Sequence, residues 1–219
     1  MTDKHRRFLG PVVEMRKLHD SAEQRIVHSA EMLDRKSLAS VGDTTGERLT
    51  ALLTETKAHT PEELAANVAR IGELLGRFAL YVPARFTDDP AEQAKYWAVR
   101  SGIFPAVGGS RPAGTTCLSE DVAFHIEDLP RATAELQALI ARHGYDDACI
   151  YGHALEGNYH FIINQSFSTP AEVARYEALM NDVAELVSAG TTARSKPSMA
   201  RGATWRPSSA ASRATTPWP

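Results

Sequence analysis

The segment "CIYGHALEGNYHFII", residues 149–163, gives the clearest indication of the fold. It has two runs rich in Ile, Tyr and Phe, which are typical of strands, on either side of Glu156 and Gly157. We predict an antiparallel hairpin with Glu156 and Gly157 as the two central residues of a tight turn. Counting outward from this turn places His153 opposite His160 on one side of the sheet, where cross-strand Cβ atoms lie about 4.5–5.5 Å apart.

The segments that surround the hairpin predict the fold class. Their patterns indicate strand 115–125, helix 129–144, strand 147–154, strand 158–165 and helix 169–187. The order strand, helix, strand, strand, helix is most of a ferredoxin-like split unit. We therefore expect an α+β fold, in which a ferredoxin-like antiparallel sheet carries helices packed on one face.

The N-terminal half has a less regular pattern. Helix 60–78 is the clearest element, because Thr60 can cap it, Pro61 suits the first helical position and Glu63 stands at the capping-box position. The other predicted elements are helix 21–40, strand 48–58, strand 79–86 and a helix that starts at residues 88–90 and stops before Pro105.

The last part of the chain differs in composition from the rest. Residues 188–219 contain no Leu, Ile, Val or Phe and no acidic side chain, but they contain five basic ones. Such a segment buries too little apolar surface to offset its ordering entropy, so we predict a disordered basic tail. The formal net charge of -3 leaves an acidic body, which argues against a nucleic-acid partner.

The remaining composition is that of an ordinary soluble protein. The 219 residues are 43% hydrophobic, which is enough for a substantial core. The cysteines, Cys117 and Cys149, have neither the number of a disulfide framework nor CxxC spacing. No apolar run has the length of a signal peptide or a transmembrane segment, so we expect a cytoplasmic protein.

His153 and His160 admit two interpretations. Two imidazoles on one side of a hairpin can share a divalent ion at about 2.0–2.1 Å per bond, although a third ligand, normally a carboxylate, is needed for a catalytic site. Alternatively, both are half-buried strand residues that hydrogen-bond to their neighbours.

The residues that frame the histidines favour the first interpretation. Gly152, His153, Gly157, Asn158 and His160 spell G-H-x-x-x-G-N-x-H. This motif resembles the metal site in the C-terminal cap domain of FAD-linked D-2-hydroxy acid dehydrogenases, which include D-lactate, glycolate and D-2-hydroxyglutarate dehydrogenases.

Two further stretches carry the same resemblance. "YWAVRSGIFPAVGG" (96–109) resembles the W-x-x-R helix of the family, and "SEDVAF" (119–124) resembles its E-D-V strand. The chain is most similar to large bacterial members that also carry iron–sulfur domains. It departs from the family at 154–156, where Ala-Leu-Glu stands in place of a frequent Gly-Asp.

The resemblance implies an organisation and a chemistry. We expect an N-terminal segment at residues 1–20, an incomplete cap domain at residues 21–187 and the tail at residues 188–219. His153 and His160, with a glutamate, would hold zinc or manganese beside FAD. The hydride would pass from C2 of a D-2-hydroxy acid to flavin N5, while the metal polarises the substrate oxygens and a nearby histidine takes the hydroxyl proton.

Three other positions take their interpretation from the same family. Arg100 would clamp the substrate carboxylate, and its alternative is a solvated helix arginine. Asn158 would contact the flavin or only permit the turn. Glu120 and Asp121 lie on opposite faces of their strand, so at most one can point into the site.

The family motif E-H-G-T-G-R, which supplies the glutamate ligand and the catalytic histidine, is absent after residue 187. Back-translation of residues 195–209, read one base earlier with permitted codons, restores this motif. We therefore expect a frameshifted C-terminus. A glycine-rich phosphate-binding loop is also absent, so we expect FAD, and any iron–sulfur cluster, to be bound elsewhere, with a flavin-domain chain as partner and an isolated chain that is inactive and without flavin absorbance.

Two other classes of function stay open on the sequence alone. One is a stand-alone ferredoxin-like binding module, in which the histidines are structural and helix 60–78 binds a partner. The other, weaker alternative is a zinc hydrolase, which lacks an evident third ligand. Metal content of the purified protein discriminates between the metal-binding cap and the binding module.

Overall fold

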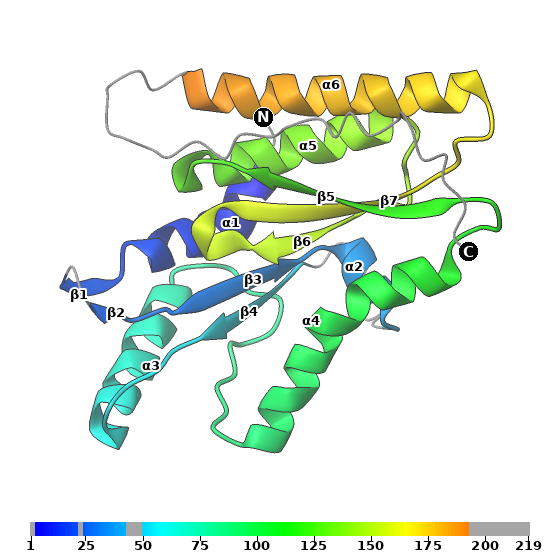
Figure 1. Cartoon of the computed structure of the whole chain (residues 1–219). Coiled ribbons are helices and arrows are strands. Elements are labelled where there is room, and N and C mark those ends of the chain that lie inside the picture. Colours follow the sequence, from blue (N-terminus) through cyan, green and yellow to red (C-terminus); the bar gives the residue numbers. More distant parts are fainter. Residues whose placement is uncertain (1–2, 22–23, 43–49, 193–219) are drawn as a thin grey trace, which may run out of the picture.

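The computed structural model describes residues 3–21, 24–42 and 50–192. Its centre is an antiparallel sheet of five strands in the order β4-β3-β6-β7-β5 (Figure 1). These strands are β3 (Ser29–Leu33), β4 (Ala51–Glu55), β5 (Thr116–Ala123), β6 (Cys149–His153) and β7 (Asn158–Gln165). A separate two-stranded sheet pairs β1 (His19–Ser21) with β2 (Gln24–Arg25). The predicted α+β class with an antiparallel sheet is confirmed.

Helices lie around this sheet (Figure 1). They are α1 (Asp3–Arg16), α2 (Arg35–Ser40), α3 (Pro61–Leu75), α4 (Pro90–Ser110), α5 (Leu129–Arg142) and α6 (Pro170–Thr192), with short 3-10 turns η1 (Ile126–Asp128) and η2 (Ala154–Glu156). The series β5-α5-β6-β7-α6 reproduces the predicted strand, helix, strand, strand, helix order, and β7 lies between β5 and β6.

The main core lies between the sheet and helices α1, α5 and α6. Alternate residues of β7, namely Tyr159, Phe161 and Ile163, point to this side and are buried together with Leu136 of α5 and Leu179 of α6. Full burial of a side chain of this size stabilises the fold by about 1.5–3 kcal/mol. This helical layer therefore fixes β6 and β7, which carry both histidines.

The opposite face of the sheet is covered only in part. Tyr151 of β6 and Ile162 of β7 pack there against Leu38 of α2 and against Ile103 and Val107 of α4. The expectation of helices on one face thus describes α1, α5 and α6, while α2 and α4 pack on the other face. The uncovered part of this second face holds the candidate site.

Helix α3 begins as the sequence predicts. The Thr60 side chain accepts the backbone N–H of Glu63 at 3.1 Å, and Pro61 occupies the first turn. The Glu63 carboxylate accepts the backbone N–H of His59 at 3.0 Å, one residue before the expected position. These bonds satisfy backbone donors that a helix start leaves free.

The predicted helix 21–40 is wrong, because this segment contains strand β3 followed by the short helix α2. β3 is a central strand with β4 and β6 as neighbours, and residues 30–33 are all buried. A strand buried on both faces shows no alternation of apolar and polar residues, so the spacing of Ile26, Ala30 and Leu33 imitated a helix.

Two further boundaries differ from the prediction. Residues 79–86 form no strand, and Leu80, Tyr81 and Val82 are exposed there. Helix α4 continues through Pro105 to Ser110. Proline removes one helical hydrogen bond, but Ile103 and Val107 bury their side chains on both sides of it, and this packing outweighs the loss.

Helix α6 extends to Thr192, beyond the predicted limit at residue 187, and Leu186 and Val187 pack against the main core. Residues 188–192 are therefore helical rather than disordered. The rest of the predicted tail, residues 193–219, lies outside the described residues. None of the helices in the described part of the chain is long and apolar enough to cross a membrane.

Candidate functional site: a histidine pair on the open face of the sheet

The connection between β6 and β7 is longer than the predicted two-residue turn. Tyr151, not His153, is the register partner of His160, and η2 followed by Gly157 forms the reversal. The predicted pairing of His153 with His160 is therefore wrong by two residues. Because residues two apart in a strand share a face, His153 and His160 still lie on the same side. Their ring centroids are 5.5 Å apart with an interplanar angle of 80°.

The two motif glycines make this reversal possible. Gly157 has φ +74°, and a Cβ there would lie 2.2 Å from the Phe124 carbonyl oxygen. Gly152 has φ +148°, and a Cβ there would lie 2.9 Å from the Asn158 carbonyl oxygen. Residues with a Cβ rarely adopt such φ angles, and their Cβ would also collide with backbone atoms here, so both positions require glycine.

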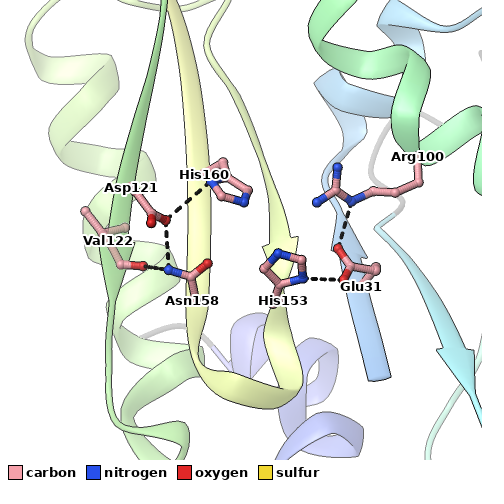
Figure 2. A network of polar contacts seen from close by, with 7 residues as sticks. All are labelled: Glu31, Arg100, Asp121, Val122, His153, Asn158 and His160. Carbon is pink, nitrogen blue, oxygen red and sulfur yellow. Dashed lines mark hydrogen bonds and ion pairs between the residues drawn. The ribbon is translucent and has the colours of Figure 1, made fainter. Parts of the chain in front are cut away.

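Glu31 of β3 joins the site, although it was not predicted from the sequence. Its Oε1 lies 2.5 Å from His153 Nδ1, and its Oε2 accepts Arg100 Nε–H at 2.7 Å (Figure 2). Glu31 is only 3% exposed. The segment was interpreted as a helix, so Glu31 was not singled out, although a Glu between apolar neighbours in "SAEML" was a usable signal.

Arg100 of α4 reaches over the sheet to the same place. Its guanidinium stacks on the Tyr151 ring at 4.5 Å from the centroid, and its side chain is 17% exposed. The interpretation as a solvated helix arginine is therefore wrong. Figure 2 shows the outer end of the guanidinium directed toward the space beside the two histidines.

Asp121 and Asn158 lie on the other side of His160. Asp121 Oδ1 is 3.3 Å from His160 Nδ1 and accepts an N–H of the Asn158 amide at 2.8 Å. Asn158 also donates to the Val122 carbonyl at 3.3 Å. The neighbouring Glu120 points to the opposite face, where it accepts from the Tyr176 hydroxyl at 2.5 Å. Only Asp121 thus faces the site.

The surroundings of His160 favour the neutral imidazole. Burial is the largest influence, and it lowers the pKa of His160. The Asp121 carboxylate opposes this change in pKa, whereas His153 and Arg100 add to it. A neutral ring has one nitrogen lone pair to offer, as a metal ligand must.

The two histidines fit a shared ion in part. Nδ1 of each ring faces a carboxylate, and Figure 2 shows the second nitrogen of each ring directed toward the gap between them. Two imidazoles bound at 2.0–2.1 Å to one tetrahedral ion have ring centres about 5 Å apart, close to the observed separation. In residues 3–21, 24–42 and 50–192, no group of three or more His, Cys, Asp or Glu is arranged to hold a metal.

Comparison with known proteins places the chain in a family. Residues 15–191 match the family of FAD linked oxidases, C-terminal domain, and the chain belongs to this family. The match covers β3, α4 and the β6–β7 reversal, and thus every residue of the site. A search of curated proteins found no significant match. The chain is therefore the cap portion of an FAD-linked oxidoreductase, with FAD as the cofactor that the family implies.

Proposed function

We propose that this chain is the substrate- and metal-binding cap of an enzyme that oxidises a D-2-hydroxy acid. The observation that carries the proposal is the convergence of His153, His160 and Arg100 on one uncovered part of the sheet. When bound, FAD would accept the substrate hydride and a divalent ion would polarise the hydroxyl oxygen. The residues of this chain would orient the substrate for that transfer.

His153 and His160 would hold the ion through the nitrogen of each ring that faces the gap. Imidazole suits zinc and manganese alike, so these ligands do not select between the two metals. Glu31 is a poor third ligand, because both of its oxygens are engaged by His153 and Arg100. The third ligand would therefore come from outside the described residues, as the family resemblance implies.

Arg100 would bind the carboxylate of the substrate. Its Nε is occupied by Glu31, which leaves the outer edge of the guanidinium to form two parallel hydrogen bonds with a carboxylate. An arginine held by stacking on Tyr151 loses less freedom when the substrate binds. The orientation of Arg100 favours a 2-hydroxy acid as substrate, because its carboxylate adjoins the carbon to be oxidised.

Asn158 has two proposed roles. Its amide nitrogen donates hydrogen bonds to Asp121 and to the Val122 carbonyl, which supports a structural role at the β6–β7 reversal. Figure 2 has its amide oxygen directed toward the space beside the histidine rings, and this supports a contact with FAD or substrate.

A flavin-domain chain or segment would cover the site. Exposed apolar side chains adjoin Arg100 on the same helix, among them Tyr96, Trp97 and Phe104. An apolar surface next to a polar site is typical of a face that another domain covers. We also propose that the reading frame shifts near the end of α6. The nucleotide sequence across codons 187–196 tests this shift, and intact codons shared by close relatives would contradict it.

Metal titration tests the proposed function. Zinc and manganese are titrated calorimetrically into the wild type, His153→Ala, His160→Ala and the control His59→Ala, whose exposed side chain precedes α3. Loss of either ligand should weaken binding at least tenfold, and the control should bind like the wild type. A wild type that binds neither metal, or histidine variants that bind normally, would contradict the metal-binding cap and favour a binding module.

A further inference from the structure

Each histidine of the pair is backed by a carboxylate from a neighbouring strand. Glu31 of β3 faces Nδ1 of His153, and Asp121 of β5 faces Nδ1 of His160 (Figure 2). A carboxylate that accepts one N–H of an imidazole decides which ring nitrogen carries the hydrogen, and therefore which nitrogen offers a lone pair. The two carboxylates differ greatly in burial.

Glu31 is held far more firmly than Asp121. The Glu31 side chain is 4% exposed and lies 2.5 Å from His153, whereas that of Asp121 is 62% exposed and lies 3.3 Å from His160. Water competes for an exposed carboxylate and screens its charge, but it competes little for a buried one. Glu31 can therefore fix a ring orientation that Asp121 only favours.

Stability alone does not account for the buried carboxylate. Taking a charge out of water is costly, and apolar residues of similar volume often serve a core as well as a buried ion pair does. The strand neighbours of Glu31, Ala30 and Met32, are apolar and buried. Its two oxygens are divided between two elements, since one meets His153 of β6 and the other meets Arg100 of α4.

We propose that Glu31 is a positioning residue that orients both His153 and Arg100 for binding. It holds the His153 hydrogen on Nδ1, so that the Nε2 lone pair faces the gap between the rings. It also holds Arg100 by Nε, so that the outer edge of the guanidinium faces the same space. This proposal rests on the proposed function, in which His153 binds a metal ion and Arg100 binds the carboxylate of the substrate.

The variant Glu31→Gln tests whether Glu31 acts through its two acceptor oxygens or only by filling space. Glutamine keeps the shape of the side chain but has an N–H₂ donor in place of one of the two acceptor oxygens, so either His153 or Arg100 loses the acceptor that it has in the wild type. We expect a 10–100-fold loss of affinity for Mn²⁺. Asp121→Asn should cost less, and Glu120→Gln, on the opposite face of the same sheet, should cost nothing.

NMR of the metal-free full chain tests the proposal without reference to metal. Long-range ¹H–¹⁵N spectra, recorded at pH about 9 where an ordinary imidazole is neutral, report which nitrogen of His153 carries the hydrogen. We expect Nδ1–H in the wild type and a mixture of both forms in Glu31→Gln. The Arg100 Nε–H should exchange slowly in the wild type and rapidly in the variant.

The outcomes separate the two proposals. Hydrogen on Nε2 of His153 in the wild type overturns the role of Glu31 whatever the variants do, and so does an unchanged tautomer in a folded Glu31→Gln. A wild type that binds no Mn²⁺ but shows Nδ1–H lost in Glu31→Gln contradicts the metal-binding cap and leaves the positioning role in place.

Discussion

Gly157 closes the reversal that brings His153 and His160 to one side of the sheet. Its φ of +74° costs a residue with a Cβ about 1–2 kcal/mol, and that Cβ would also collide with the Phe124 carbonyl oxygen. Gly157→Ala should therefore lower the free energy of unfolding by about 3 kcal/mol or more in chemical denaturation.

Gly114→Ala is the matched control for this prediction. Gly114 has φ +80°, but a Cβ there would meet nothing within 4 Å. It should thus show the backbone cost alone, about 1–2 kcal/mol. Equal losses in the two variants would mean that the contact with Phe124 contributes nothing.

At the scale of the residue, family motifs predicted more of the site residues than the strand pattern did. The glycines and histidines of 152–160 could be singled out because their spacing resembles a family motif, and Arg100 through W-x-x-R. Glu31 belongs to no such motif, so an acidic residue between apolar neighbours is its one local signal, and its contacts with His153 and Arg100 join residues far apart in the sequence. Only the register of β3 against β6 places it beside His153.

At the scale of the element, Asp34 caps helix α2 directly after strand β3. Asp34 follows β3, is 5% exposed, and its Oδ1 accepts the Ser37 N–H at 2.8 Å as the helix cap. Burial raises the pKa of Asp34 above its ordinary value, although hydrogen bonds from Ser37 oppose this. The native carboxyl therefore takes up a proton at higher pH than the unfolded one.

This shift predicts the pH dependence of a variant. As pH falls from neutral toward about 4, the ordinary Asp pKa, the native state binds more protons at Asp34 than the unfolded state does. The free energy of unfolding of the wild type should thus rise relative to Asp34→Asn, which keeps a capping oxygen but does not titrate. Denaturation of both proteins at several pH values measures the difference. A constant difference, or one that falls, would contradict the raised pKa.

The elements with strong local signals could be predicted, and those set by tertiary contacts could not. Thr60 and Pro61 mark the start of α3 in the sequence itself. β3 owes its conformation to hydrogen bonds with β4 and β6, and its apolar residues carry no period that marks a strand. The length of α4 beyond Pro105 likewise depends on packing against the sheet.

At the scale of the whole molecule, α6 is the last element of the described chain, and the predicted tail follows it. Leu186 and Val187 pack against the main core, whereas residues 193–219 have the composition of a disordered segment. Removal of residues 193–219 should change the free energy of unfolding by less than about 0.5 kcal/mol.

A shorter chain is the comparison for this truncation. Ending the protein at residue 185 removes Leu186 and Val187 from the core and should cost about 1–3 kcal/mol. Thermal and chemical denaturation of the three chains measure both effects. A large loss of unfolding free energy on removing residues 193–219 would contradict the prediction that the tail is disordered.

The central claim is that His153 and His160 bind one ion together. X-ray absorption of the zinc-loaded full chain measures this most directly, because imidazole ligands give a distinct multiple-scattering pattern. The account predicts two imidazole nitrogens at about 2.0–2.1 Å in the wild type and one in His160→Ala. A zinc shell of oxygen alone, or a shell unchanged in His160→Ala, would contradict it.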